Sequence, residues 1–288
     1  MSFPTSFPPQ HQDQHPGLEY TMNPLPVYDD DKYVAKGTLL QDKVAMITGG
    51  DSGIGRAVAL AFAKQGAHVA IAYLNESKDA ETIKAKIESL GRECLLIETD
   101  LTEPVNCTAA ISKTISHFNK LDILVNNAAV QYEATKLELI SDEQFDKTFK
   151  TNVYGAFHMT KAALPHLKAG SSIINTTSVV AFHGSENLID YSMTKGALTA
   201  FTRSLSTSLA KSKSGIRVNA VAPGPIWTPF IPSCTSAQNV STFGSNTPLG
   251  RAGQPIECAG AYVFLASEAA SYITGQTIHI NGGEIVNG

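Results

Sequence analysis

The chain has 288 residues, of which 43% are hydrophobic and 17% charged, and its formal net charge is −4. This composition is typical of a globular protein with a sizeable core, and the length suits one large α/β domain or two small ones. Because the chain has no basic excess and no run of about 18 apolar residues, the sequence argues against nucleic-acid binding and against a membrane span.

Residues 1–38 differ in composition from the rest of the chain. They are rich in Pro, Gln, His and Asp, and they show neither a helical nor a strand period. We interpret them as an extended N-terminal arm, either disordered alone or laid over a surface. They lack a basic segment followed by an apolar stretch, so we expect no secretory signal and a cytoplasmic protein. The acidic run 29–31 is interpreted as solvated, and the four cysteines form no C-x-x-C pair, so we expect neither a metal site nor a disulfide.

Short apolar runs alternate with longer amphipathic stretches over residues 39–288. Because the runs are almost continuously apolar, this pattern predicts a parallel sheet with helices on both faces. No linker or repeat interrupts the pattern, so we predict a single α/β domain with a Rossmann-type doubly wound sheet. The predicted strands are residues 44–47, 69–73, 94–97, 123–125, 173–175, 218–221 and 278–280, and the predicted helices include 56–65, 79–90, 141–150 and 191–210.

A glycine-rich turn, Thr-Gly-Gly-Asp-Ser-Gly-Ile-Gly at residues 48–55, joins the first predicted strand to a helix. Such a turn lets a pyrophosphate approach the backbone and places it at the positive end of the helix dipole. The spacing differs from the commoner G-x-G-x-x-G, and a tight turn without a ligand is the alternative. A side chain at Gly49 or Gly55 should collide with the cofactor or with the helix–strand packing.

Tyr191 and Lys195 are one helical turn apart, on the same face of a predicted helix. An ammonium near a phenol lowers the phenol pKa from its usual value of ~10, which allows proton exchange with a carbonyl or an alcohol near neutral pH. The spacing alone is weak evidence, because residues 28–32 and 132–136 share it. Only Tyr191 begins a long helical pattern and follows a strand that ends near Ser178. A helix-surface pair is the alternative.

Residues 229–249 form a long predicted segment rich in Ser, Thr and Asn. A loop of this length is often a lid, and a plain surface loop is the alternative. We expect the segment to close over a substrate. The side chains proposed as walls of that substrate site are Gln131, Phe182, His183 and Trp227.

These motifs, in this order, resemble the short-chain dehydrogenase/reductase family over residues 40–288. The arm motifs Phe-Pro-Pro-Gln at 7–10, Gln-His-Pro-Gly at 14–17 and Met-Asn-Pro at 22–24 resemble a subgroup of general-stress and aldehyde-reductase-like enzymes that includes glucose and ribitol dehydrogenase homologues. The resemblance implies a set of cofactor-binding residues. They are Gly49, Asp51, Ser52, Gly53, Ile54, Gly55, Tyr73, Asn75, Asp100, Leu101, Asn127, Ala128, Ala129, Tyr191, Lys195, Pro223, Gly224, Ile226 and Thr228.

The resemblance also implies four catalytic residues: Asn152, Ser178, Tyr191 and Lys195. Ser178 would hydrogen-bond the reacting oxygen, and Tyr191 would transfer the proton. Lys195 would hold the nicotinamide ribose and lower the tyrosine pKa, and Asn152 would hold a water of the proton relay. Ala129 stands where the family usually has glycine, which should reshape the turn under the cofactor slightly without abolishing binding.

The end of the second predicted strand bears on the choice of cofactor. NAD-specific enzymes usually place an acidic residue there to bind the ribose 2′-hydroxyl, whereas this chain has Tyr73. Asn75, Arg56 and Lys78 could accept a 2′-phosphate, and Glu76 argues for NAD(H). We expect either NADP(H) or NAD(H), with NADP(H) slightly preferred.

The function implied is the interconversion of a carbonyl and an alcohol by hydride transfer, in a homotetramer that takes a small-molecule substrate. A non-catalytic nicotinamide-binding sensor or scaffold, a sugar or polyol dehydrogenase, and a sugar-nucleotide epimerase or dehydratase are alternatives, because fold does not dictate function. The intact catalytic set argues against a sensor. The glycine spacing and the absence of an added substrate domain argue against an epimerase.

Overall fold

Seven parallel strands form one sheet in the computed structural model, which describes residues 3–286. The strand order is β3-β2-β1-β4-β5-β6-β7, so the direction of winding reverses between β1 and β4. This order confirms the predicted doubly wound Rossmann-type sheet, and all seven predicted strands are present. The strands are β1 (Val44–Thr48), β2 (His68–Tyr73), β3 (Cys94–Glu98), β4 (Ile123–Asn126), β5 (Ser172–Thr176), β6 (Arg217–Pro223) and β7 (Thr277–Ile280).

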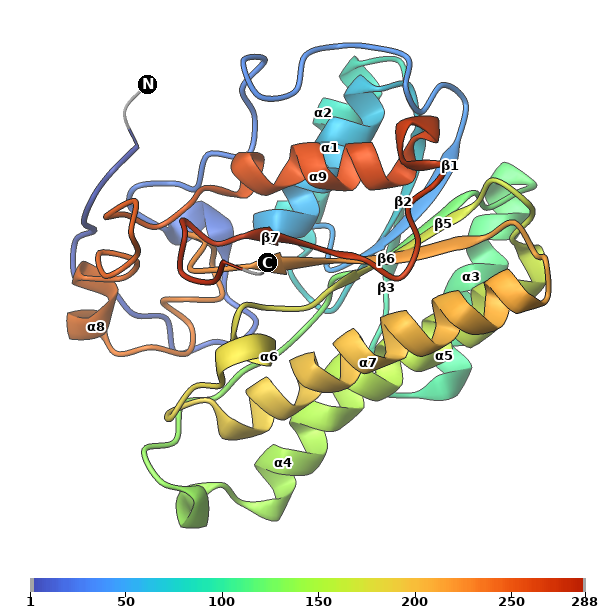
Figure 1. Ribbon diagram of the computed structural model, residues 1–288. Helices are drawn as coiled ribbons and strands as arrows, with labels where there is room; N and C mark the ends of the chain where they lie inside the picture. Colours follow the sequence, from blue (N-terminus) through green and yellow to red (C-terminus); the bar gives the residue numbers. More distant parts are fainter. Residues whose placement is uncertain (1–2, 287–288) are drawn as a thin grey trace.

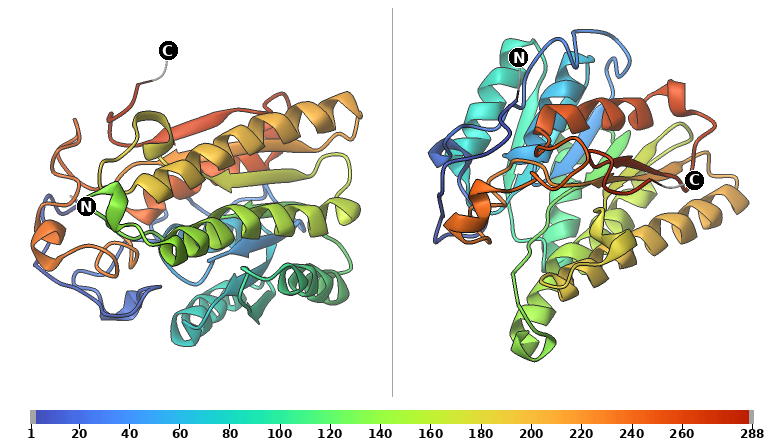
Figure 2. Two further views of the ribbon diagram at one scale, coloured as in Figure 1. Left: turned by 90° about the horizontal axis from the view of Figure 1, so that it is seen from below. Right: turned by 60° about the vertical axis from the view of Figure 1, so that its left-hand side comes forward.

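Helices cover both faces of the sheet (Figure 1). One layer contains α1, α2 and α9, and the other contains α3, α5 and α7; the turned views in Figure 2 show the same two layers. The α-helices are α1 (Gly53–Lys64), α2 (Ser77–Ser89), α3 (Pro104–Phe118), α4 (Asp142–Phe149), α5 (Gly155–Ala163), α6 (Val180–His183), α7 (Ile189–Lys211), α8 (Ala237–Ser241) and α9 (Pro255–Ala266).

Successive strand residues supply two separate cores, because side chains alternate between the faces of a sheet. In β1, Ala45 and Ile47 pack in the core that contains α1 and α9. Val44 and Met46 pack in the core that contains α3 and α5. Each strand is therefore apolar on both faces, which explains why the sequence shows continuous apolar runs instead of alternation.

Local signals set the ends of several helices. Pro104 and Pro255 lie in the first turns of α3 and α9, where a missing N–H costs nothing. The Glu257 carboxylate accepts a hydrogen bond from the Gln254 backbone N–H at 2.8 Å, and the Ser141 hydroxyl accepts one from the Gln144 N–H at 3.1 Å. Between α4 and α5 the chain forms a π-helical turn at Lys150–Tyr154, a feature that is frequent at functional sites.

The arm is laid over the domain, one of the two arrangements expected for it. It has little regular structure beyond a 3₁₀ helix at Glu19–Thr21, and it anchors itself through buried apolar side chains such as Phe7 and Met22. The division into an arm of residues 1–38 and a domain of residues 39–288 stays a prediction. At the carboxyl ends of the strands the arm meets the 229–249 segment, at the left of Figure 1.

Within residues 3–286, no helix has the length and hydropathy to cross a membrane, and no three His, Cys, Asp or Glu side chains lie close enough to hold a metal ion. All four cysteines are free. The acidic run is not simply solvated, since Asp29 and Asp31 both form ion pairs with Lys64.

Candidate active site

A cavity of about 260 Å³ lies at the carboxyl ends of the strands, where the winding of the sheet reverses. Ligands of doubly wound sheets bind at this position because loops diverge there. Fourteen of the predicted cofactor-binding or catalytic residues line the cavity. They are Gly49, Asp51, Ser52, Gly53, Ile54, Tyr73, Asp100, Leu101, Asn127, Ala128, Ala129, Tyr191, Lys195 and Thr228.

The glycine-rich turn needs its glycines for two different reasons. Gly49 has φ +61° and Gly53 has φ +53°, a left-handed conformation that side chains disfavour. At Gly55 a Cβ would lie 1.9 Å from the Gly49 carbonyl oxygen. Gly55 therefore serves the packing of helix against strand, the second of the two reasons predicted for it, and it lies outside the cavity lining.

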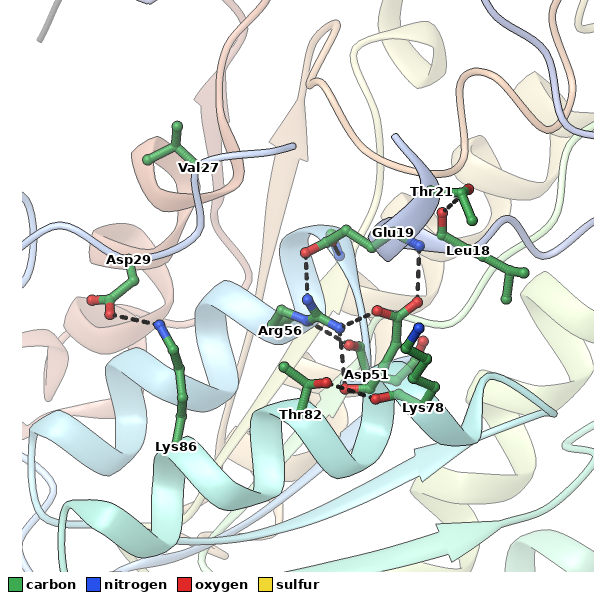
Figure 3. A network of polar contacts seen from close by, with 12 residues as sticks. Leu18, Glu19, Thr21, Val27, Asp29, Asp51, Arg56, Lys78, Thr82 and Lys86 are labelled. Atoms are coloured by element: carbon green, nitrogen blue, oxygen red, sulfur yellow. Dashed lines mark hydrogen bonds and ion pairs between the residues drawn. The ribbon is translucent and has the colours of Figure 1, made fainter. Parts of the chain in front are cut away.

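Arg56, directly after this turn, is held by the arm (Figure 3). Its guanidinium forms ion pairs with Glu19 at 2.6 Å and with Asp79 at 2.7 Å, and all three side chains are buried. The second Glu19 carboxylate oxygen accepts a hydrogen bond from the Gly53 N–H at 2.6 Å. Because two carboxylates neutralise Arg56, it is not free to bind a 2′-phosphate, and that expectation is wrong.

The cavity wall beyond β2 carries acidic rather than basic side chains. Leu74 and Glu76 line the cavity beside Tyr73, whereas Asn75 is exposed and does not line it. Burial and the nearby Glu76 charge raise the pKa of Asp51 to about 7. Of the two residues predicted here for the cofactor, Tyr73 lines the cavity and Asn75 does not.

Tyr191 and Lys195 lie at the other end of the cavity, and Ser178 lies behind its lining in contact with Tyr191. Ser178 follows β5, while Tyr191 and Lys195 lie on the first turns of α7. The Ser178 hydroxyl hydrogen-bonds the Tyr191 phenol. The Lys195 ammonium lies 5.4 Å from the centre of the Tyr191 ring and donates a hydrogen bond to the Thr176 carbonyl oxygen at 2.8 Å. The structure thus brings together Tyr191 and Lys195, which the sequence paired by their spacing, and Ser178, which the sequence placed at the end of the preceding strand.

Burial dominates the electrostatics of this group. It raises the pKa of Tyr191, with the hydrogen bond from Ser178 opposing the rise. It also lowers the pKa of Lys195, which is only 2% exposed, to about 7. The expected lowering of the tyrosine pKa is therefore not found. The free-energy cost of removing a phenolate from water outweighs its attraction to Lys195, whose own charge is destabilised by burial.

Asn152 lies in the π-helical turn and anchors the backbone beside the cavity. Its side chain accepts a hydrogen bond from the Val130 N–H at 2.8 Å and donates to the Val130 carbonyl at 2.9 Å. It also donates to the Thr194 hydroxyl at 3.1 Å, on the helix that carries Tyr191. Three of the hydrogen-bonding positions of its amide are thus taken by protein groups, which makes the side chain a positioning element.

Asp190 fixes the start of α7 and was not found by sequence reasoning. Its buried carboxylate accepts hydrogen bonds from the Thr148 hydroxyl at 2.9 Å and from the Tyr191 N–H at 2.8 Å. Gln144 donates a third at 3.1 Å. The carboxylate therefore joins α4 to α7 immediately before the catalytic tyrosine candidate.

Comparison with known proteins agrees with this geometry. A family model described as enoyl-(acyl carrier protein) reductase matches residues 49–284. The chain belongs to the short-chain dehydrogenase/reductase family. It is 48% identical to a glucose and ribitol dehydrogenase of Daucus carota, over 98% of each chain, and 48% identical to the chloroplastic NADPH-dependent aldehyde reductase 1 of Arabidopsis thaliana, over 96% of this chain and 98% of that one. A Burkholderia cenocepacia short-chain dehydrogenase solved with NADP matches with a TM-score of 0.80 and 31% identity, over 86% of this chain and 99% of that chain.

The side chains predicted as walls of the substrate site lie elsewhere in this short-chain dehydrogenase/reductase. Trp227 is fully buried and stacks on Phe7 of the arm, and Gln131 donates a hydrogen bond to the Cys234 sulfur. His183 forms an ion pair with Glu284. Phe182 packs against the ring of His279, so none of the four lines the cavity and that prediction is wrong.

Other residues line the cavity without having been predicted. Pro223, Gly224 and Ile226, which the family resemblance assigned to the cofactor, lie outside this lining, and Gly224 packs against Asn281. The arm contributes three lining residues that no periodicity could have indicated. The lining residues missed from the sequence are His15, Pro16, Gly17, Ala72, Leu74, Thr99, Thr102, Val130, Lys147, Thr151 and Thr176, whereas Glu76 and the 229–249 segment, here Pro229 and Phe230, were considered.

Proposed function

We propose that this oxidoreductase uses NAD(P)(H) to interconvert an aldehyde or ketone and the corresponding alcohol, with Tyr191 as the general acid and base. The observation that supports this most strongly is a cavity that contains Tyr191 and Lys195 at one end, with Ser178 hydrogen-bonded to Tyr191, and a glycine-rich turn at a helix N-terminus at the other end. Such a cavity positions a carbonyl oxygen and a dinucleotide together.

Reduction is the direction favoured by the protonation of these groups. Burial raises the pKa of Tyr191, so its phenol is protonated at neutral pH and can donate a proton to a carbonyl oxygen. Ser178, which hydrogen-bonds the phenol, would hold the same oxygen. A charged Lys195 stabilises the phenolate left behind, and its pKa of about 7 makes that help dependent on pH.

A nicotinamide dinucleotide fits the described cavity. Its pyrophosphate would lie at the N-terminus of α1, where Gly49 carries no side chain; the Gly53 N–H is already bonded to Glu19. Asp100 and Leu101 would line the adenine end, and Lys195 would hold the ribose at the other end. The cofactor, when bound, supplies the hydride.

We propose that NADP(H) binds at least as well as NAD(H). Tyr73 provides no charge against a 2′-phosphate, and an Asp51 carboxyl with a pKa of about 7 carries less than a full negative charge at neutral pH. The names of the Arabidopsis relative and of the Burkholderia structure, which mention NADPH and NADP, support the same choice. Paired titrations in which NADH binds far more tightly than NADPH would contradict it.

A panel of aldehydes with NADPH, followed by the absorbance of the reduced nicotinamide, tests the proposed reaction. Tyr191→Phe should lower turnover by a factor on the order of 10²–10⁴ and leave NADPH affinity nearly intact, because only the proton donor is removed. Tyr272→Phe, at an exposed tyrosine, is the matched control and should change neither quantity. Full activity of Tyr191→Phe would refute the assignment, and no turnover of any carbonyl or alcohol would favour a non-catalytic sensor.

A sugar or polyol dehydrogenase is the second candidate, favoured by the name of the Daucus carota relative. The same assay in the oxidative direction, with ribitol and glucose, separates it from an aldehyde reductase.

We also propose a cytoplasmic homotetramer. Exposed apolar side chains such as Phe157 on α5 and Met193 on α7 support self-association, and light scattering that gives a monomer mass would contradict it.

A further inference from the structure

The arm and the 229–249 segment are packed together at the mouth of the cavity. Phe7 stacks on Trp227, with ring centres 3.8 Å apart, and the Gln12 N–H donates a hydrogen bond to the Pro232 carbonyl at 2.7 Å. Gly17 fits so closely that a Cβ would lie 2.4 Å from the Pro229 carbonyl oxygen. The arm is therefore a fixed part of the cavity wall and lies where a substrate would enter.

His15 is the arm side chain with hydrogen-bonding capacity in this wall. Its Nδ1 lies 2.7 Å from the Ser233 hydroxyl, which donates its single hydrogen to the Phe230 carbonyl at 3.0 Å. With the Ser233 hydrogen on the Phe230 carbonyl, the Ser233 oxygen accepts from Nδ1, and this arrangement assigns the hydrogen of a neutral His15 ring to Nδ1. The other nitrogen, Nε2, is left as a hydrogen-bond acceptor.

Nε2 of His15 is buried and has no hydrogen-bond partner among residues 3–286. The ring packs against Tyr132 and Phe230, both with ring centres 5.4 Å away, so it cannot turn freely. Burial and the Lys147 charge lower the pKa of His15 to about 4, which keeps the ring neutral. A buried acceptor without a donor costs free energy, which a ligand hydroxyl would recover.

His15 and Tyr191 line the same cavity, on either side of Phe230. The centre of the Phe230 ring is 5.4 Å from the His15 ring and 6.1 Å from the Tyr191 ring. A substrate whose carbonyl oxygen lies at Tyr191 and whose chain extends past Phe230 would bring a substituent to His15. A hydroxyl donates to a bare nitrogen acceptor, whereas an alkyl group leaves it unpaired.

We propose that His15 is a specificity-determining residue that accepts a hydrogen bond from a substrate hydroxyl. The substrate class is then hydroxylated carbonyl compounds, such as short hydroxyaldehydes and their polyol products, in preference to plain alkyl aldehydes. This inference rests on the proposed function, since it places the carbonyl at Tyr191.

The test compares glyceraldehyde with propanal, which has the same carbon chain without hydroxyls. His15→Phe should lower kcat/KM for glyceraldehyde about 3- to 10-fold relative to propanal, the effect of one hydrogen bond between neutral groups. His15→Gln should retain most of the preference, because its amide oxygen can accept the same bond. His11→Ala is the matched control, since His11 also contacts the 229–249 segment, at the Thr235 carbonyl, but does not line the cavity.

A purely structural role for His15 would change kcat/KM by the same factor for both substrates. The ratio of the two values would then be unchanged, and that result would overturn the proposal. If His15→Phe does not fold, the ratio measured for His15→Gln and His15→Ala decides in the same way. Failure of the proposed function looks different, because the wild-type enzyme would then turn over neither glyceraldehyde nor propanal nor any other carbonyl.

Discussion

Removal of the Glu19 carboxylate is expected to destabilise the protein through a contact that joins the arm to the glycine-rich turn. Glu19→Ala eliminates the ion pair with Arg56 and the acceptor of the Gly53 N–H, both at 2.6 Å. The Glu19 and Arg56 side chains are only 1% and 5% exposed, so neither broken contact is replaced easily by water. The change tests whether the arm is part of the folded domain.

The expected magnitude follows from this burial. Loss of one partner of a buried ion pair costs about 3–5 kcal/mol. Because Asp79 remains 2.7 Å from Arg56, we expect the lower part of that range, and the unpaired Gly53 N–H adds about 1 kcal/mol. The sum, about 4 kcal/mol, corresponds to a fall in Tm of roughly 8–16 °C for a chain of this size.

Urea unfolding and thermal unfolding at fixed protein concentration measure this loss, and limited proteolysis reports release of the arm. Asp146→Ala is the control, because its ion pair with Lys150 is exposed and should contribute little to stability. A double-mutant cycle with Arg56→Met should show coupling between Glu19 and Arg56. If Glu19→Ala is no more destabilising than Asp146→Ala, the reasoning about the arm is refuted.

Two further predictions concern charges in the cavity. The kcat of carbonyl reduction should fall as the pH rises from ~6 to ~8.5, because Lys195, with a pKa of about 7, loses the charge that stabilises the Tyr191 phenolate; a flat or rising pH profile would contradict this. Glu76→Gln should raise NADPH affinity relative to NADH about 2- to 10-fold, because it removes a carboxylate from the cavity wall that would repel a 2′-phosphate. Paired titrations with NADPH and NADH measure that ratio. Glu81→Gln, on the exposed face of α2, is the control. An unchanged ratio in Glu76→Gln would show that Glu76 does not face the phosphate.

Features that depend on neighbours along the chain could be predicted from the sequence. The strands were found because each is apolar on both faces, and the glycine-rich turn because it joins a strand directly to a helix. Tyr191 and Lys195 were found because an α-helix brings residues four apart onto one face. Those local rules were sufficient for the fold class, for the position of the cavity and for its central side chains.

Features that depend on packing between distant segments were decided only by the tertiary structure. His15 meets Ser233 across 218 residues, and Glu19 meets Arg56 across 37, through an arm that has no period to indicate where it lies. The direction of the Tyr191 pKa shift was likewise decided by burial, which a spacing of four residues does not reveal. The sequence by itself determined which chemical groups are present and which of them share a helix face; tertiary packing decided which groups water reaches and which line the cavity.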